Sequence, residues 1–144
     1  MRTLLLLFML ALGQTAFAAC DVTITAGDGI AYDKTIIEVE RSCESVTVTL
    51  KHTGSLPRNA MGHNWVLSKS GDLDAVAQAG LGAGLENNYV PPGDARVLAN
   101  TTVVGGGEET SVTFSLAELP DAEYAFFCSF PGHWAIMKGV LKIT

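Results

Sequence analysis

Short runs in which apolar and polar residues alternate recur along most of the chain. The clearest run covers residues 45–51, where Val46, Val48 and Leu50 alternate with polar side chains. Further runs of this kind begin at Val22, Ile37, Ser111 and Gly139. A repeat of two is typical of a half-buried β-strand, and short strands separated by Gly, Asp and Pro favour a sandwich or barrel of antiparallel strands. The sequence therefore predicts an all-β fold.

One segment, residues 70–85, departs from this repeat. Its apolar residues are spaced three and four apart, and Ser70 or Asp72 could cap a helix at its start. Three glycines near the end of the segment weaken helical structure there. We predict one short helix inserted between strands. Because the chain contains no internal repeat and no linker, we also predict a single domain.

The first 18 residues have the features of an export signal. Arg2 supplies a positive start, residues 4–12 form an apolar run, and small residues stand two apart at Ala16 and Ala18. The run is too short to span a bilayer, since a spanning helix needs roughly 20 apolar residues. We predict cleavage after residue 18 or 19, which leaves residues 19–144 as a soluble periplasmic domain without membrane insertion.

The charge balance bears on the partners of this domain. The chain has nine Lys and Arg against fifteen Asp and Glu, and loss of Arg2 changes the formal net charge from −6 to −7. Nucleic acids and anionic membranes are bound by clustered basic residues, and the sequence has no basic run. We therefore expect neither as a partner.

Three cysteines in an exported chain leave one without a partner inside the chain. Cys20 and Cys43 lie near the start, whereas Cys128 stands alone near the end. The simplest interpretation is a disulfide between Cys20 and Cys43 and a functional thiol at Cys128. A second interpretation stays open, because residues 17–20 loosely resemble a lipoprotein cleavage site that would place a lipid on Cys20.

Metal-ligating side chains are concentrated near the end of the chain. His133 follows Cys128 by five residues and Met137 follows His133 by four, with a Pro-Gly pair between Cys128 and His133 that lets the backbone turn. Two imidazoles and a thiolate in a plane, with a weak axial thioether, are the ligands of copper in electron-transfer sites. The second imidazole is assigned to His63, which sits where a strand is expected to begin. We predict one copper held by these four residues.

Other functions fit the same residues less well. A Cys–His nucleophile would need an orienting acidic or amide side chain, and it would leave His63 and Met137 without a role. A copper enzyme would need a second metal centre, for which only His52 remains among the histidines. We therefore predict an electron carrier that is not an enzyme. A periplasmic copper chaperone is the alternative.

The block at residues 56–67, the Cys-x4-His-x3-Met spacing, the early cysteine pair and the inserted helical segment together resemble the azurins, bacterial members of the cupredoxin family. The resemblance implies a Greek-key β-sandwich and a blue type 1 copper site with the Gly62 carbonyl as a weak contact. It also implies that Asn64 braces the ligand loops and that the Phe130 N–H group bonds to the Cys128 sulfur.

The resemblance further implies an apolar patch around the exposed edge of His133, where redox partners such as c-type cytochromes or copper or haem reductases dock transiently. The expected members of this patch are Ile30, Leu56, Met61, Leu81, Phe130, Pro131, Trp134 and Ala135. Trp134 replaces the small polar residue usual in the family, so it either enlarges the patch or alters partner choice or electron relay. His52 matches a family histidine linked to pH effects on the potential, or is hydrogen-bonded without such a role.

Overall fold

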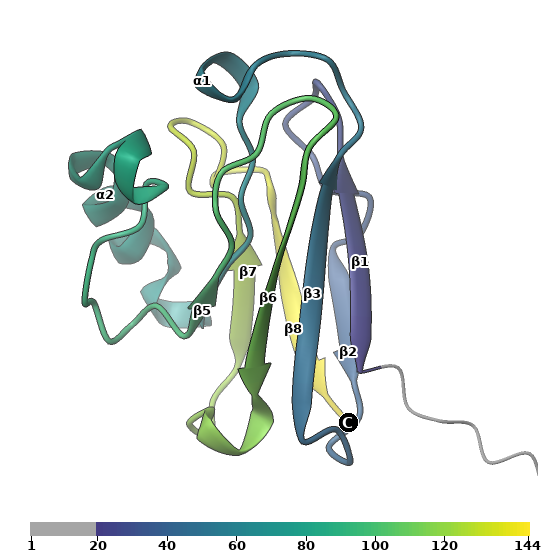
Figure 1. Ribbon diagram of the computed structural model, residues 1–144. Helices are drawn as coiled ribbons and strands as arrows, with labels where there is room; N and C mark the ends of the chain where they lie inside the picture. Colours follow the sequence, from purple (N-terminus) through teal and green to yellow (C-terminus); the bar gives the residue numbers. More distant parts are fainter. Residues whose placement is uncertain (1–19) are drawn as a thin grey trace, which may run out of the picture.

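The computed structural model describes residues 20–144, which form two β-sheets packed face to face (Figure 1). The three-stranded sheet has the order β1 (Asp21–Ala26), β3 (Ser45–His52) and β6 (Glu109–Ser115). The five-stranded sheet has the order β2 (Ile36–Val39), β8 (Lys138–Ile143), β7 (Tyr124–Phe127), β4 (Val66–Lys69) and β5 (Ala99–Asn100). The predicted all-β sandwich is confirmed. The predicted export signal and its cleavage site lie outside the described residues.

The strand directions differ from the prediction in two places. β1 pairs with β3 and β2 pairs with β8 in parallel, whereas the other pairs are antiparallel. Both sheets are therefore mixed, and the expected antiparallel pairing is found in the other four strand pairs only. Alternation of apolar and polar residues reports which face of a strand is buried, and it carries no information on the direction of the neighbouring strand.

Side chains from both sheets form the core. Trp65 is fully buried and stacks on Phe114 and Phe126, with ring centroids 5.9 Å apart in each pair. The three-stranded sheet contributes Val48 and Leu50, which are also fully buried. This aromatic and aliphatic packing joins the two sheets and gives the connecting loops a rigid base.

The predicted helix is confirmed as α2 (Leu73–Ala83), which ends at Gly84 with a positive φ of 73°. The 3-10 turns η1 (Ser70–Asp72) and η2 (Leu85–Asn87) flank it. The buried face of α2 packs on the outer side of the five-stranded sheet, against Val66 of β4 and Phe127 of β7. A further turn, η3 (Leu116–Glu118), follows β6.

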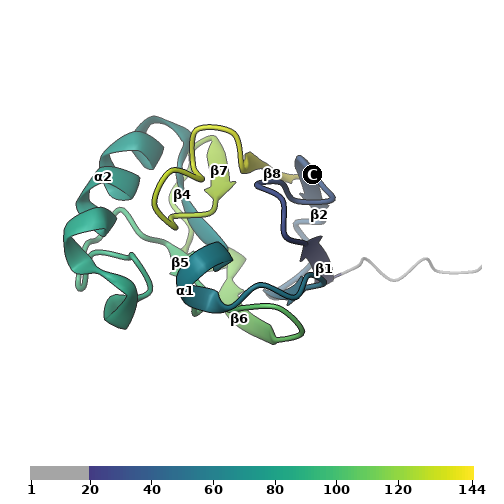
Figure 2. The same cartoon turned by 90° about the horizontal axis from the view of Figure 1, so that it is seen from above.

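One short helix and one disulfide complete the frame. Helix α1 (Arg58–Met61) was not expected from the sequence, and it lies at the same end of the sandwich as the loop between β7 and β8 (Figures 1 and 2). The predicted disulfide between Cys20 and Cys43 is confirmed. A bridge over a loop of this length stabilises the fold by about 3 kcal/mol in the chain-entropy model. A sulfur in this bond is not available to carry a lipid.

Candidate metal centre

The loop between β7 and β8, residues 128–137, is closed by its own backbone. The Cys128 N–H donates to the Met137 carbonyl at 3.0 Å, and the Met137 N–H donates to the His133 carbonyl at 2.8 Å. The His133 N–H donates in turn to the Phe130 carbonyl at 3.0 Å. The turn between them uses Gly132 with a φ of 81°, a left-handed conformation that favours glycine. Cys128 and His133 are thereby directed to one point.

His63 comes from a segment that precedes β4. It exchanges two backbone hydrogen bonds with Val104, at 3.0 and 2.8 Å, as an isolated bridge. The strand itself begins only at Val66, slightly later than the sequence indicated. A Cβ atom on Gly62 would lie 2.3 Å from the Arg58 carbonyl oxygen, so glycine is needed where α1 meets this segment.

The three side chains converge in the interior. The Cys128 sulfur lies 3.6 Å from Nδ1 of His133 and 3.9 Å from Nδ1 of His63. The three possible ligand atoms are all within 4.8 Å of one another, and the three residues are buried, with exposed fractions of 0, 4 and 0 % for Cys128, His133 and His63. Met137 is fully buried and belongs to the same core cluster as Cys128.

Hydrogen bonds fix the tautomer of His63. Its Nε2–H group donates to the Gly27 carbonyl at 2.8 Å, which leaves the Nδ1 lone pair directed at the Cys128 sulfur. His52 stacks on the His63 ring, with centroids 4.7 Å apart. Its own Nε2–H group donates to the Met61 carbonyl, and its Nδ1 accepts from the Gly54 N–H. His52 is therefore held from both ring nitrogens beside the site.

Burial determines the protonation of the three groups. It raises the pKa of the Cys128 thiol to about 12, although hydrogen bonds from the backbone N–H groups of Asn64 and Phe130 to the sulfur partly oppose this. Burial also lowers the pKa of His63, and it lowers the pKa of His133 to about 4. Both imidazoles are neutral at pH 7 and can act as ligands. The thiol gives up its proton only when a cation takes its place.

Asn64 connects the two ligand-bearing segments. Its Oδ1 accepts from the Ser129 N–H at 2.9 Å, and its Nδ2 donates to the Ser129 hydroxyl and to the Asn88 carbonyl, each at 2.8 Å. The Tyr32 hydroxyl donates to the Asn64 carbonyl. Sequence analysis identified Asn64 but not Ser129, Asn88 or Gly27. The position of Ser129 next to Cys128 could have indicated it. Gly27 and Asn88 contact His63 and Asn64 through backbone carbonyls, which a sequence pattern does not indicate.

The donor set fits copper. Two neutral imidazoles, one thiol and a thioether in the same buried cluster combine soft and borderline ligands, which copper prefers over the oxygen ligands of magnesium or calcium. No other group of three His, Cys, Asp or Glu side chains within residues 20–144 has this arrangement.

Comparisons with known proteins agree with this assignment. Residues 18–144 match the family described as copper binding proteins, plastocyanin/azurin family. The chain belongs to the plastocyanin/azurin family. It is 57 % identical over 128 residues to an azurin of Bordetella pertussis, covering 88 % of this chain and 85 % of that protein. It is 55 % identical to azurin-1 of Alcaligenes xylosoxydans xylosoxydans, covering 88 % and 99 % of the two chains.

A solved structure gives the same result for the fold. The azurin Az-iso2 of Methylomonas sp. strain J superposes with a TM-score of 0.84 at 48 % identity, over 88 % of this chain and 99 % of that one. Membership of the plastocyanin/azurin family confirms the predicted copper cofactor and the predicted class of blue copper electron carrier.

Several apolar side chains of the expected patch, and of the loop that carries His133, are exposed. Leu56 is 41 %, Leu81 is 42 % and Ile136 is 69 % exposed. Of the other expected patch members, Pro131 and Ala135 are exposed, Ile30, Met61 and Trp134 are half-buried, and Phe130 is buried. The sequence analysis did not include Ile136 among the exposed apolar residues, although its position between His133 and Met137 on one loop could have indicated it. Trp134 packs beside α2, on the buried cluster that includes Val66 and Phe127.

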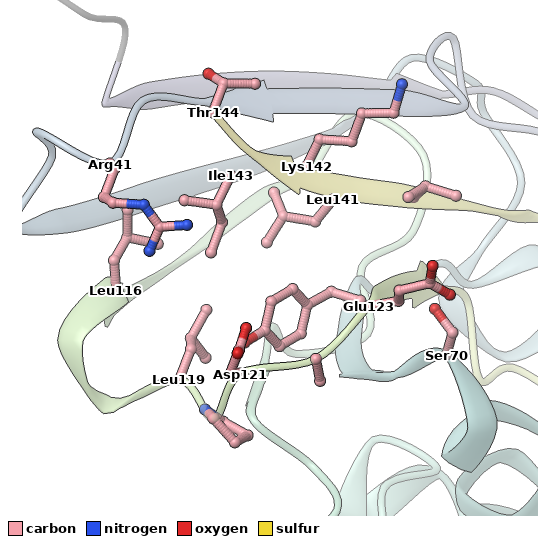
Figure 3. A pocket seen from close by; sticks show the side chains of 14 residues that line it. Arg41, Ser70, Leu116, Leu119, Asp121, Glu123, Leu141, Lys142, Ile143 and Thr144 are labelled. Atoms are coloured by element: carbon pink, nitrogen blue, oxygen red, sulfur yellow. The ribbon is translucent and has the colours of Figure 1, made fainter.

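The end of the sandwich away from the metal centre is hollowed. It carries an open hollow of about 870 Å³ whose lining includes Arg41, Leu119, Asp121 and Tyr124 (Figure 3). This hollow contains none of the residues of the metal centre. Among the helices of residues 20–144, none is long and apolar enough to cross a membrane.

Proposed function

We propose that this protein carries single electrons on one type 1 copper held by His63, Cys128 and His133. The Met137 sulfur and the Gly62 carbonyl serve as weaker contacts. The observation that supports this assignment most strongly is the convergence of two neutral imidazole nitrogens on one buried thiol. Copper, when bound there, supplies a one-electron couple between Cu(I) and Cu(II).

The residues around the site keep the ligands in one arrangement for both redox states. The Gly27 carbonyl fixes the His63 ring, and Asn64 ties the Cys128 loop to the His63 segment. Buried and fully hydrogen-bonded groups of this kind resist displacement. Ligands that barely move on gain or loss of an electron make the transfer fast.

The N–H groups of Asn64 and Phe130 act on the charge of the site. Both hydrogen-bond to the Cys128 sulfur, which bears negative charge as a thiolate. Such bonds withdraw electron density from the sulfur and thereby set the reduction potential. For a one-electron couple, a change of about 59 mV alters the equilibrium with a partner tenfold.

We infer that electrons enter and leave through the His133 edge. The loop that carries this histidine exposes the apolar side chains of Pro131, Ala135 and Ile136. An apolar surface without dense charge suits a small, short-lived interface, which an electron carrier needs. Partners such as c-type cytochromes or copper or haem reductases in the periplasm fit this mode. We further infer that residues 1–18 direct export and that residues 19–144 are the mature domain.

Absorption and EPR spectra of the copper-loaded protein test the assignment, with Cys128→Ser as the paired variant. The wild type is expected to be intensely blue when oxidised and to bleach reversibly on reduction, whereas Cys128→Ser lacks the blue band because it lacks the thiolate. A colourless wild-type protein that exchanges copper rapidly would instead indicate the chaperone function.

A further inference from the structure

We propose that Asn88 is a positioning residue that sets the spacing between the His63 segment and the Cys128 loop. This inference rests on the function proposed above, because those two segments supply the copper ligands. Asn88 itself belongs to neither segment. It stands directly after η2, at the corner where the inserted helical region returns to the sandwich.

Asn88 contacts three segments around the metal centre. Its carbonyl accepts from Nδ2 of Asn64 at 2.8 Å and from the Ser129 hydroxyl at 3.4 Å. Its side-chain Oδ1 accepts from the Val103 N–H at 2.9 Å. Asn64 follows His63 and Ser129 follows Cys128, while Val103 precedes the residue that pairs with His63. One residue thus joins the segments that carry His63 and Cys128 to the segment that pairs with His63.

The backbone at this corner is in an uncommon conformation. Asn88 and Tyr89 have φ values of 57° and 52°, and they are the non-glycine residues with positive φ within residues 20–144. A left-handed conformation is unfavourable for a residue with a side chain, and it persists only where the surroundings impose it. This conformation directs the Asn88 carbonyl toward Asn64 and Ser129. Asn is among the residues that tolerate it best.

Helix α2 supports the corner from behind. A Cβ atom on Gly80 would lie 2.0 Å from the Tyr89 carbonyl oxygen, so the glycine lets the helix approach the backbone of the corner closely. The Tyr89 ring meets the Phe130 ring edge-on at 5.4 Å, and the Phe130 ring lies 4.7 Å from that of His133. The inserted helix therefore has a role in the site. It holds Asn88 and Tyr89 against the ligand-bearing loops.

The test compares Asn88→Gly with Asn87→Gly. Glycine at position 88 keeps the left-handed backbone and the carbonyl but removes the Oδ1 acceptor, which leaves the buried Val103 N–H without a partner. Asn87 is the matched control because its exposed side chain makes one hydrogen bond, to the Ala83 carbonyl, and touches neither ligand segment. Asn88→Asp retains an acceptor at the same place and is the rescue variant. Amide exchange of the metal-free protein and the copper hyperfine splitting in EPR are measured for all three.

In Asn88→Gly we expect the Val103 amide to exchange about tenfold faster, as for a buried donor left unpaired. The Ser129 amide is also expected to exchange several-fold faster, and the hyperfine splitting to change. Asn88→Asp and Asn87→Gly should match the wild type in the exchange rate of the Ser129 amide and in the copper hyperfine splitting. The proposal is overturned if Asn88→Gly leaves the Ser129 amide and the hyperfine splitting as they are in Asn87→Gly. If the wild type holds no blue copper, the proposed function fails, and the Ser129 amide in metal-free protein still decides the role of Asn88.

Discussion

The two histidines of the metal centre occupy contrasting environments. His63 is fully buried, donates from Nε2 to the Gly27 carbonyl and stacks on His52. His133 is 4 % exposed on a loop with exposed neighbours, and within residues 20–144 its Nε2 has no hydrogen-bond partner. The contrast separates two tasks. We propose that His63 fixes the geometry of the site and that His133, on the loop with exposed neighbours, connects the site to a partner.

The largest expected difference is in stability and in rescue by imidazole, between the variants His63→Gly and His133→Gly. His63→Gly leaves an internal cavity and an unpaired Gly27 carbonyl, and we expect it to lower the free energy of unfolding by about 4 kcal/mol. His133→Gly opens a gap toward solvent and should cost much less. Added imidazole should restore the blue colour in His133→Gly but not in His63→Gly. Urea unfolding and imidazole titration measure both effects, and equal rescue of the two variants would contradict the contrast.

Asn64→Leu should break the connection between the His63 segment and the Cys128 loop. It leaves the buried Ser129 N–H without its acceptor and removes the donor to the half-buried Asn88 carbonyl. We expect a loss of about 3 kcal/mol in the free energy of unfolding of the metal-free protein. Asn59→Leu, at an exposed position in α1, is the matched control. A similar stability for both variants would show that Asn64 does not connect the segments energetically.

Acid should destabilise the metal-free protein through both histidines. Burial lowers the pKa of His133 to about 4 and also lowers that of His63, so the unfolded chain binds more protons than the folded chain below the ordinary histidine pKa of about 6.5. The free energy of unfolding should therefore fall as the pH decreases from about 6.5 toward 4. Urea unfolding at a series of pH values measures this. In His133→Gly the decrease should be smaller, and an unchanged slope would exclude His133 as its source.

The smallest expected changes in stability come from two side chains of the loop between β7 and β8, Trp134 on its buried side and Ile136 on its exposed side. Trp134 packs on the cluster beneath α2, so Trp134→Ser should lower the free energy of unfolding by about 1–2 kcal/mol. Ile136 is 69 % exposed, and Ile136→Ser should change stability by less than about 0.5 kcal/mol while slowing electron transfer to a partner. Stopped-flow rates with a c-type cytochrome measure the second effect. A partner rate that depends on Trp134 and not on Ile136 would reverse these roles.

The parts of the fold that could be predicted are those with one face in solvent. β3 alternates cleanly because its outer side chains are exposed, whereas β7 is buried throughout and shows no repeat of two. Helix α2 covers the outer face of β4 and β7, which removes the polar positions that would have indicated strands. The parallel pairing of β1 with β3 depends on chain crossings between the sheets, which local patterns do not record.

The same division applies to the site. Cys128, His133 and Met137 lie on one short loop, so their spacing alone indicates a common target. Asn88 and Gly27 come from distant segments and meet Asn64 and His63 through backbone carbonyls, a group that every residue type has. The bond from the Val103 N–H to Oδ1 of Asn88 likewise depends on how the folded chain brings the two segments together. The left-handed backbone of Asn88 and the close approach of Gly80 in α2 to the Tyr89 carbonyl are seen only in the folded chain.

A crystal structure of the copper-loaded protein would test the central assignment most directly. We expect one copper atom bonded to Nδ1 of His63, Nδ1 of His133 and Sγ of Cys128, with the Met137 sulfur at a longer distance. A copper atom bound elsewhere, or one bound without either imidazole or the thiolate, would contradict the account.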